Sequence, residues 1–118
     1  MVLTEAELAE LRLALEALAR ELPEALASSS AAARPVELDQ SSVGRVSRID
    51  AIQQQKMVEA GRHALQARLQ LVRSALSRFE DGDFGACAIC GESIGYARLS
   101  ARPETPLCLE CQERRERR

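Results

Sequence analysis

Four cysteines in two closely spaced pairs constrain this chain more than any other feature. Cys87 and Cys90 form one Cys-x-x-Cys pair, and Cys108 and Cys111 form a second after seventeen intervening residues. The chain has no other cysteine. A Cys-x-x-Cys turn points two sulfurs at one spot, and two facing turns supply the four thiolates of a closed zinc site. The spacing therefore predicts one structural Zn²⁺ ion, because four protein ligands leave no coordination position open for catalysis.

Two other uses of paired cysteines are less consistent with the sequence. Disulfides are typical of exported proteins, but residues 1–5 show no basic start followed by an apolar run, and no stretch approaches a membrane span. A thioredoxin-like redox site needs a βαβ frame, which the pattern does not indicate. We therefore expect a cytoplasmic zinc protein. Gly91, directly after Cys90, supports this, because glycine can adopt the positive φ that turns backbone N–H groups toward the sulfurs.

The first part of the chain predicts a helix over about residues 5–27. Thr4 and Glu7 have the spacing of a capping box. Pro23 is expected to kink or interrupt this helix near its end. Six leucines recur at helical spacings of three and four and predict one apolar stripe: Leu8, Leu11, Leu15, Leu18, Leu22 and Leu26.

A second helix is predicted over about residues 47–80, with Ser47 as its N-cap and residues 28–46 as the connection. Its apolar stripe is weaker near the start and comprises Ile49, Ile52, Val58, Leu65, Leu69, Val72, Leu76 and Phe79. Residues 1–27 carry a net charge of −4 and residues 47–79 carry +4. Opposite charges suit two neighbouring helices, so we expect a monomeric, mainly α fold with a long antiparallel coiled-coil hairpin over residues 1–80.

The remaining residues, 81–118, are predicted to form a small four-cysteine zinc-finger module. Short segments around Ile94–Leu99 suggest a small β-hairpin between the cysteine pairs. Residues 112–118 are predicted to form a charged C-terminal helix.

The flanking residues of the cysteines resemble the DksA/TraR zinc-finger family. The pattern is Asp83-Phe84-Gly85-x-Cys87-x-x-Cys90-Gly91, Ile94-Gly95, Arg98-Leu99-x-Ala101-Arg102-Pro103 and Leu107-Cys108-x-x-Cys111. The likeness implies that all four cysteines bind zinc. It also implies a bacterial transcription regulator that binds RNA polymerase directly and inserts its coiled-coil tip into the secondary channel, with no sequence-specific DNA binding and no membrane partner.

The resemblance further implies roles for the head of the molecule and for a nucleotide. Arg98 and Arg102 would lie on the globular part, where they could pair with acidic polymerase surface. Several family members act with the stringent-response alarmone (p)ppGpp at the interface between regulator and polymerase. Relatives that use the alarmone often carry a basic residue after the last cysteine, and this chain has Gln112 there.

The hairpin tip departs from the family pattern. The best-studied members carry Asp-x-x-Asp-x-Ala, whereas the nearest arrangement here runs from Ser47 to Ala51 and holds one acid. The candidate tip contacts are Asp50, Ala51, Arg48, Arg45 and Asp39. Helix capping by Ser47 and Asp50 is a simpler explanation for two of these positions.

Two other classes of function remain open at this point. A zinc-ribbon nucleic-acid binder would need a basic, aromatic surface, but residues 80–118 hold eight acids against six arginines and the whole chain is −2. A coiled-coil interaction adaptor would need a continuous heptad stripe, which residues 28–46 interrupt. An enzyme is not expected, because the sequence shows no catalytic pair, phosphate loop or open metal position.

Overall fold

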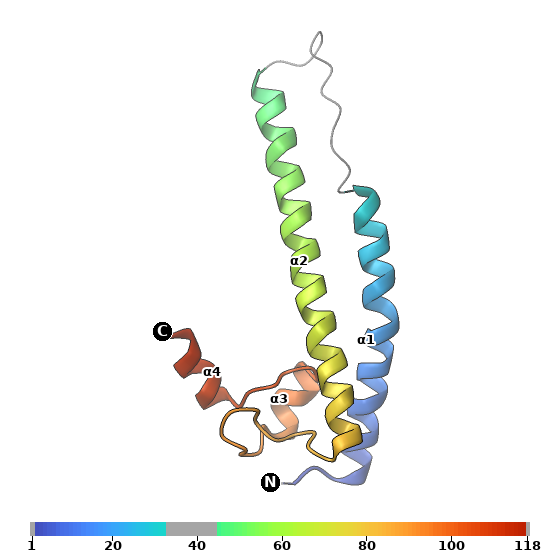
Figure 1. Cartoon of the computed structure of the whole chain (residues 1–118), viewed down its shortest axis with the longest axis vertical. Helices are drawn as coiled ribbons and strands as arrows, with labels where there is room; N and C mark the ends of the chain where they lie inside the picture. The colour runs from blue at the N-terminus through green and yellow to red at the C-terminus, as the bar shows by residue number, and fades with distance from the viewer. Residues whose placement is uncertain (1, 33–44, 118) are drawn as a thin grey trace.

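The computed structural model describes residues 2–32 and 45–117, with side chains at 2–29 and 48–117. The helices of these segments are α1 (Glu5–Ala32), α2 (Arg45–Asp81), α3 (Tyr96–Ala101) and α4 (Leu109–Glu116). Helices α1 and α2 lie side by side and antiparallel, and the cysteine-rich module packs at the base of this hairpin (Figure 1). The prediction of a mainly α chain, with a long helical hairpin and a small C-terminal four-cysteine module, is confirmed.

Helix α1 begins where its capping box predicts. The backbone N–H of Glu7 donates to Thr4 Oγ1 over 3.1 Å, and the N–H of Thr4 donates to Glu7 Oε1 over 2.9 Å. The helix then continues through Pro23 to Ala32, so the predicted end at residue 27 is wrong. Leu22 and Leu26, one on each side of the proline, pack against α2. These contacts keep the segment helical across Pro23.

Helix α2 begins at Arg45, two residues before the predicted start, so Ser47 lies inside the helix and is not its N-cap. Its 37 residues make it longer than α1, which has 28. At 1.5 Å per residue, α2 is about 55 Å long. None of the helices in the described segments is long and apolar enough to cross a membrane.

The core between the two long helices lies toward the base of the hairpin. Its buried members are Leu15, Leu22, Leu69, Val72 and Ala75. Four leucines of the predicted α1 stripe pack in this core: Leu15, Leu18, Leu22 and Leu26. Ile49 and Ile52 at the far end of α2 are 47% and 48% exposed, so these two members of the predicted stripe are not core residues. The far half of the hairpin is less buried than the base, as the weaker stripe indicated.

A second core joins the cysteine module to the hairpin. Its buried members are Leu11, Cys87, Ile94, Leu99, Leu107 and Cys111. Phe79 of α2 stacks on Phe84 at a ring separation of 3.9 Å, and both rings also pack against the hairpin core. The guanidinium of Arg12 lies 5.8 Å from the centre of the Phe79 ring. The module is therefore packed onto the hairpin base through aromatic and aliphatic contacts.

The predicted β-hairpin around Ile94–Leu99 is wrong. A single antiparallel bridge pairs Ala86 with Ser93, and the chain then turns at Gly95 into helix α3. Gly95 has a φ of 96°, which favours glycine, and Leu99 is completely buried. Burial of one side of this short helix against the module core decides its conformation. The predicted charged C-terminal helix is present as α4, beginning at Leu109.

Candidate metal centre

The first cysteine pair lies in a tight turn closed by the Ala86–Ser93 bridge. The N–H of Cys87 donates to the Glu92 carbonyl over 2.7 Å, and the N–H of Gly91 donates to the Cys87 carbonyl over 3.0 Å. Gly91 has a φ of +76°, as its place after the second cysteine predicted. This left-handed residue lets the chain turn back, so both sulfurs lie on one side of the turn.

The second cysteine pair lies at the start of helix α4. Cys108 is the N-cap, and its Sγ accepts a hydrogen bond from the N–H of Cys111 over 3.4 Å. The N–H of Ala88, in the first turn, donates to the Pro106 carbonyl over 2.9 Å. This backbone hydrogen bond joins the two turns, and the two pairs of sulfurs face each other.

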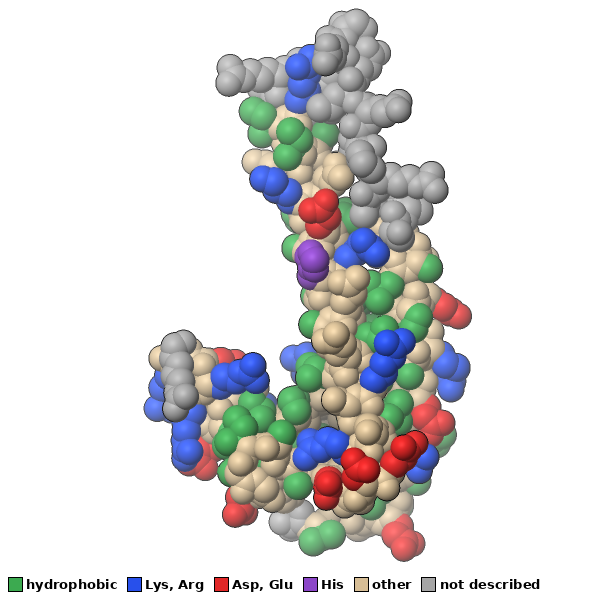
Figure 2. Space-filling model, in the orientation of Figure 1, with side chains coloured by type: hydrophobic (Ala, Val, Ile, Leu, Met, Phe, Trp, Pro, Cys, Tyr) green, Lys and Arg blue, Asp and Glu red, His purple; other side chains and the backbone are tan. Residues whose placement is uncertain are grey.

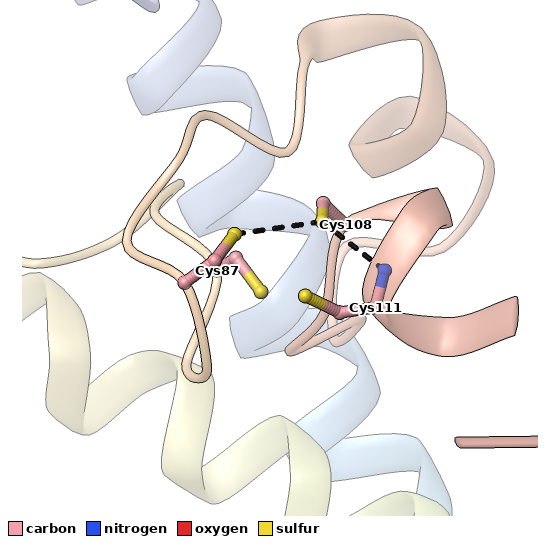
Figure 3. A group of neighbouring side chains, drawn as sticks. Cys87, Cys108 and Cys111 are labelled. Carbon is pink, nitrogen blue, oxygen red and sulfur yellow. Dashed lines mark hydrogen bonds between the residues drawn. The ribbon is translucent and has the colours of Figure 1, made fainter. Parts of the chain in front are cut away.

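The four sulfurs form one cluster. The Sγ atoms of Cys87, Cys90, Cys108 and Cys111 all lie within 4.8 Å of one another. Figure 3 shows the labelled sulfurs converging from the two turns. The Cys90 and Cys108 sulfurs are 3.7 Å apart, close to the edge of about 3.8 Å in a tetrahedron with Zn–S bonds of about 2.3 Å. All four cysteines are free, so the donor set fits zinc.

The thiols of this cluster differ in their tendency to ionise. Burial raises the pKa of Cys87, but hydrogen bonds from the backbone at Cys90, Cys108 and Ile89 outweigh it and lower that pKa to about 6. A hydrogen bond with the Cys108 sulfur, together with burial, raises the pKa of Cys111 to about 12. Four adjacent sulfurs cannot all carry negative charge without a cation between them. A divalent metal supplies that charge and releases the remaining protons.

Comparison with known proteins identifies this module. Residues 82–117 match the family model described as "Prokaryotic dksA/traR C4-type zinc finger". The cysteine module is therefore a zinc finger of the DksA/TraR type.

Curated proteins named DksA match about two fifths of the chain. It is 53% identical over 47 residues to the "RNA polymerase-binding transcription factor DksA" of Caulobacter vibrioides NA1000, covering 40% of this chain and 33% of that protein. The protein of the same name from Escherichia coli K12 is 43% identical over 44 residues, covering 37% and 29%. The aligned segment thus spans about a third of the length of these relatives.

Solved DksA structures match most of the chain. The transcription factor DksA2 of Pseudomonas aeruginosa superimposes with a TM-score of 0.73 at 26% identity, covering 96% of this chain and 85% of that one. The DnaK suppressor protein of Agrobacterium tumefaciens C58 gives a TM-score of 0.57 at 27% identity, covering 90% and 91%. The likeness to DksA therefore extends from the finger to the hairpin.

Four of the five predicted tip residues lie in the first turns of α2, at the end of this helix far from the DksA-type finger (Figure 1): Arg45, Arg48, Asp50 and Ala51. Asp50 is exposed, and Arg48 and Ala51 are half-buried. Arg45 is the first residue of α2, and its side chain lies outside the described ones. Asp39 falls outside the described residues altogether.

The two predicted head arginines lie on or beside α3, and both make contacts within the chain. Arg98 is half-buried, and its Nε donates to the Leu107 carbonyl over 3.1 Å. Arg102 has a side chain that is 66% exposed, and its Nε lies 3.4 Å from Glu104 Oε2. These two residues are therefore partly engaged in holding the finger together.

Sequence reasoning missed an ion cluster between finger and hairpin. The side chain of Glu104 is fully buried, and its Oε2 accepts a hydrogen bond from Arg68 Nε on α2 over 2.9 Å as well as the contact from Arg102. Glu104 Oε1 bonds none of the described residues. The one available signal was Arg68 itself, which interrupts the apolar face between Leu65 and Val72. Its partner lies 36 positions away, beyond the reach of local patterns.

Proposed function

We propose that this chain binds RNA polymerase directly and regulates transcription without catalysing a reaction. The observation that carries the proposal is the combination of a DksA/TraR finger with a long hairpin in the arrangement of DksA2. The curated relatives of the finger are named as RNA polymerase-binding transcription factors. The alignments with them cover 40% and 37% of this chain, so the hairpin's part in the function rests on the overall likeness of the fold.

We assign the zinc ion a structural role, with one ion held by Cys87, Cys90, Cys108 and Cys111. The four sulfurs supply a complete tetrahedral set. Cys87 and Cys111 are also members of the buried core that joins the finger to α1 and α2. When bound, the ion would offset part of the negative charge of the four thiolates and hold the two turns together, and the finger's packing on the hairpin would depend on it.

The hairpin is suited to enter a narrow channel. The described part of the molecule measures 64 × 33 × 20 Å, and only the two long helices extend away from the finger (Figure 1). A pair of packed helices has a small cross-section, since helix axes pack about 8–10 Å apart. We propose that this end enters the secondary channel of polymerase while the finger, with Arg98 and Arg102, stays outside and contacts the rim.

At the inserted end, Asp50 is the acid that we propose to contact polymerase near its catalytic centre. Its carboxylate is exposed and lies in the second turn of α2. Arg48 and Arg45 would pair with acidic polymerase groups, beside Ala51 and the connecting segment that contains Asp39. Such contacts need neither DNA sequence recognition nor a second copy of the chain, and we propose a monomeric regulator.

A binding and transcription experiment tests this function. Purified, zinc-loaded protein is mixed with purified RNA polymerase, and co-elution and promoter-complex lifetime are both measured. We expect co-elution of wild type, and we expect Asp50→Ala to reduce the effect on the promoter complex more than the affinity. Glu59→Ala is the matched control, because it removes an exposed acid from the same helix farther from the tip. Failure of wild type to bind polymerase would refute the proposal.

A further inference from the structure

One buried carboxylate lies between two arginines where the finger meets the hairpin. Glu104 has a fully buried side chain, and its Oε2 lies 2.9 Å from Arg68 Nε and 3.4 Å from Arg102 Nε. The neighbouring backbone is restrained, because the N–H of Thr105 donates to the Arg102 carbonyl and Pro106 accepts from Ala88. The carboxylate is therefore held in place before any ligand arrives.

Glu104 and Arg102 also line a large open groove between α2, α3 and α4. The groove has a volume of about 1050 Å³, and Figure 2 shows the notch between the finger and α2 in which it opens. Its charged lining residues are three arginines and three glutamates: Arg98, Arg102, Arg115, Glu104, Glu113 and Glu116. The formal charge of this lining is thus zero, with three positive and three negative groups.

This lining does not fit a polyphosphate such as (p)ppGpp. A ligand with several phosphate charges is bound by Arg and Lys donors that are free to form paired, charge-assisted hydrogen bonds. Here Arg102 contacts Glu104, and Arg98 Nε donates to a backbone carbonyl. Gln112, which follows the last cysteine, donates its amide to Glu116 over 3.0 Å. A phosphate entering the groove would meet the exposed carboxylates of Glu113 and Glu116 as well as the arginines.

We propose that Glu104 is an internal substitute for an anionic ligand, which occupies Arg68 and Arg102 and makes this groove unresponsive to nucleotide polyphosphates. The carboxylate supplies the negative charge that holds α2 and the α3–α4 connection together, so no bound phosphate is needed for that contact. If the proposed function is correct, it follows that the action of this regulator on polymerase is independent of (p)ppGpp. Only this consequence rests on the proposed function. The binding step itself needs no polymerase.

The test is a titration of the zinc-loaded full chain with inorganic pyrophosphate, and separately with (p)ppGpp, followed by the NMR signals of the arginine Nε–H groups. Wild type should show no saturable shift at Arg68 or Arg102. Glu104→Gln keeps the shape and removes the charge, and it should bind pyrophosphate through both arginines at least about tenfold more tightly than wild type. Glu113→Gln is the matched control, because it removes another acid of the groove that has no contact with these two arginines.

Three outcomes would overturn the proposal: saturable binding by wild type at Arg68 and Arg102, no gain in a folded Glu104→Gln variant, or an equal gain in Glu113→Gln. If Glu104→Gln does not fold, hydrogen exchange in wild type decides the question. The Nε–H groups of Arg68 and Arg102 should exchange more slowly than that of Arg115, and equal rates would contradict the proposal. Because neither measurement contains polymerase, failure here is distinct from failure to bind polymerase.

Discussion

The base and the far half of this molecule are built differently. At the base, leucines of α1 and α2 are completely or almost completely buried, and the finger adds a second core beside them. Within the described part of α2, no side chain between residues 48 and 68 is buried, and Ile49, Ile52 and Met57 are exposed. Apolar burial, the main source of stability, is therefore concentrated where the finger and the two helices meet.

This difference separates two tasks along one hairpin. At the base, the finger is fixed in its orientation on the hairpin. Stacked aromatic rings, buried leucines and the Arg68–Glu104 contact fix it there. In the far half, fewer side chains must pack in a core. Its surface can therefore carry the groups that we propose to contact polymerase. Four predictions test how strongly the two regions differ, beginning with the largest effect.

Loss of zinc should unfold the finger and leave most of the hairpin helical. A structural zinc site contributes an apparent ~10–16 kcal/mol in finger peptides, which exceeds what a small core supplies alone. We expect Cys108→Ser to lose amide-exchange protection over residues 82–117 while most of the helical circular dichroism remains. Ile89→Ser, an exposed change within the first cysteine turn, is the control. An unchanged thermal transition of the finger in Cys108→Ser would show that zinc is not its main support.

Truncation of a core leucine should cost far more at the base than truncation at the far end. Leu15 is completely buried, so Leu15→Ala should lower the free energy of unfolding by about 3 kcal/mol. Ile52 is 48% exposed, so Ile52→Ala should lower it by less than about 1 kcal/mol. Urea unfolding of the zinc-loaded protein measures both changes. Equal losses would mean that the far half is as tightly packed as the base.

The capping box at the base should make a smaller, local contribution. Thr4→Ala removes the oxygen that accepts from the Glu7 N–H and should lower the free energy of unfolding by about 1 kcal/mol. Thr4→Ser keeps that oxygen and is the control. Both are measured by urea unfolding. A loss of the same size in Thr4→Ser would assign the effect to the threonine methyl group and not to the cap.

The smallest effect concerns the contact between Tyr96 and Glu10. The Tyr96 hydroxyl donates to Glu10 Oε2 over 2.6 Å, and this hydrogen bond, with burial and the negative charge of Glu10, raises the pKa of Tyr96 above its ordinary value. Because the folded pKa is raised, the contact contributes stability below about pH 10 and is lost as the pH rises through the folded pKa.

Tyr96 is the only tyrosine, so the ultraviolet absorbance of tyrosinate reports its titration directly. We expect Glu10→Gln to lower the titration midpoint toward the ordinary pKa of tyrosine, whereas Glu5→Gln, on the same helix, should leave it nearly unchanged. A midpoint that does not respond to Glu10→Gln would show that α3 is not held to α1 by this contact.

Sequence patterns predicted the features that depend on contacts between residues close together in the chain. Two Cys-x-x-Cys pairs place four sulfurs together because each turn is set by a few residues, and Gly91 supplies the positive φ that follows the first pair. Thr4 and Glu7 predicted the start of α1 because both partners lie within one helical turn. The leucine stripe predicted which side of α1 is buried, because helical periodicity alone places those side chains on one face.

Other features depended on contacts between distant segments. Pro23 and the predicted connection over residues 28–46 indicated an early end to α1, yet the helix continues to Ala32. The segment from Tyr96 to Ala101 has no helical pattern long enough to detect, and burial of Leu99 against the finger core accounts for its helix.

Spacing along the chain determined the metal centre and the helical class of this protein. Only the tertiary structure decided where α1 ends, how the finger sits on the hairpin, and that Glu104 lies buried against Arg68, 36 residues away. The physical reason is the distance along the chain between the interacting residues. Turns, caps and helix faces depend on neighbours within about four residues. Burial of a charge depends instead on which distant segments pack around it.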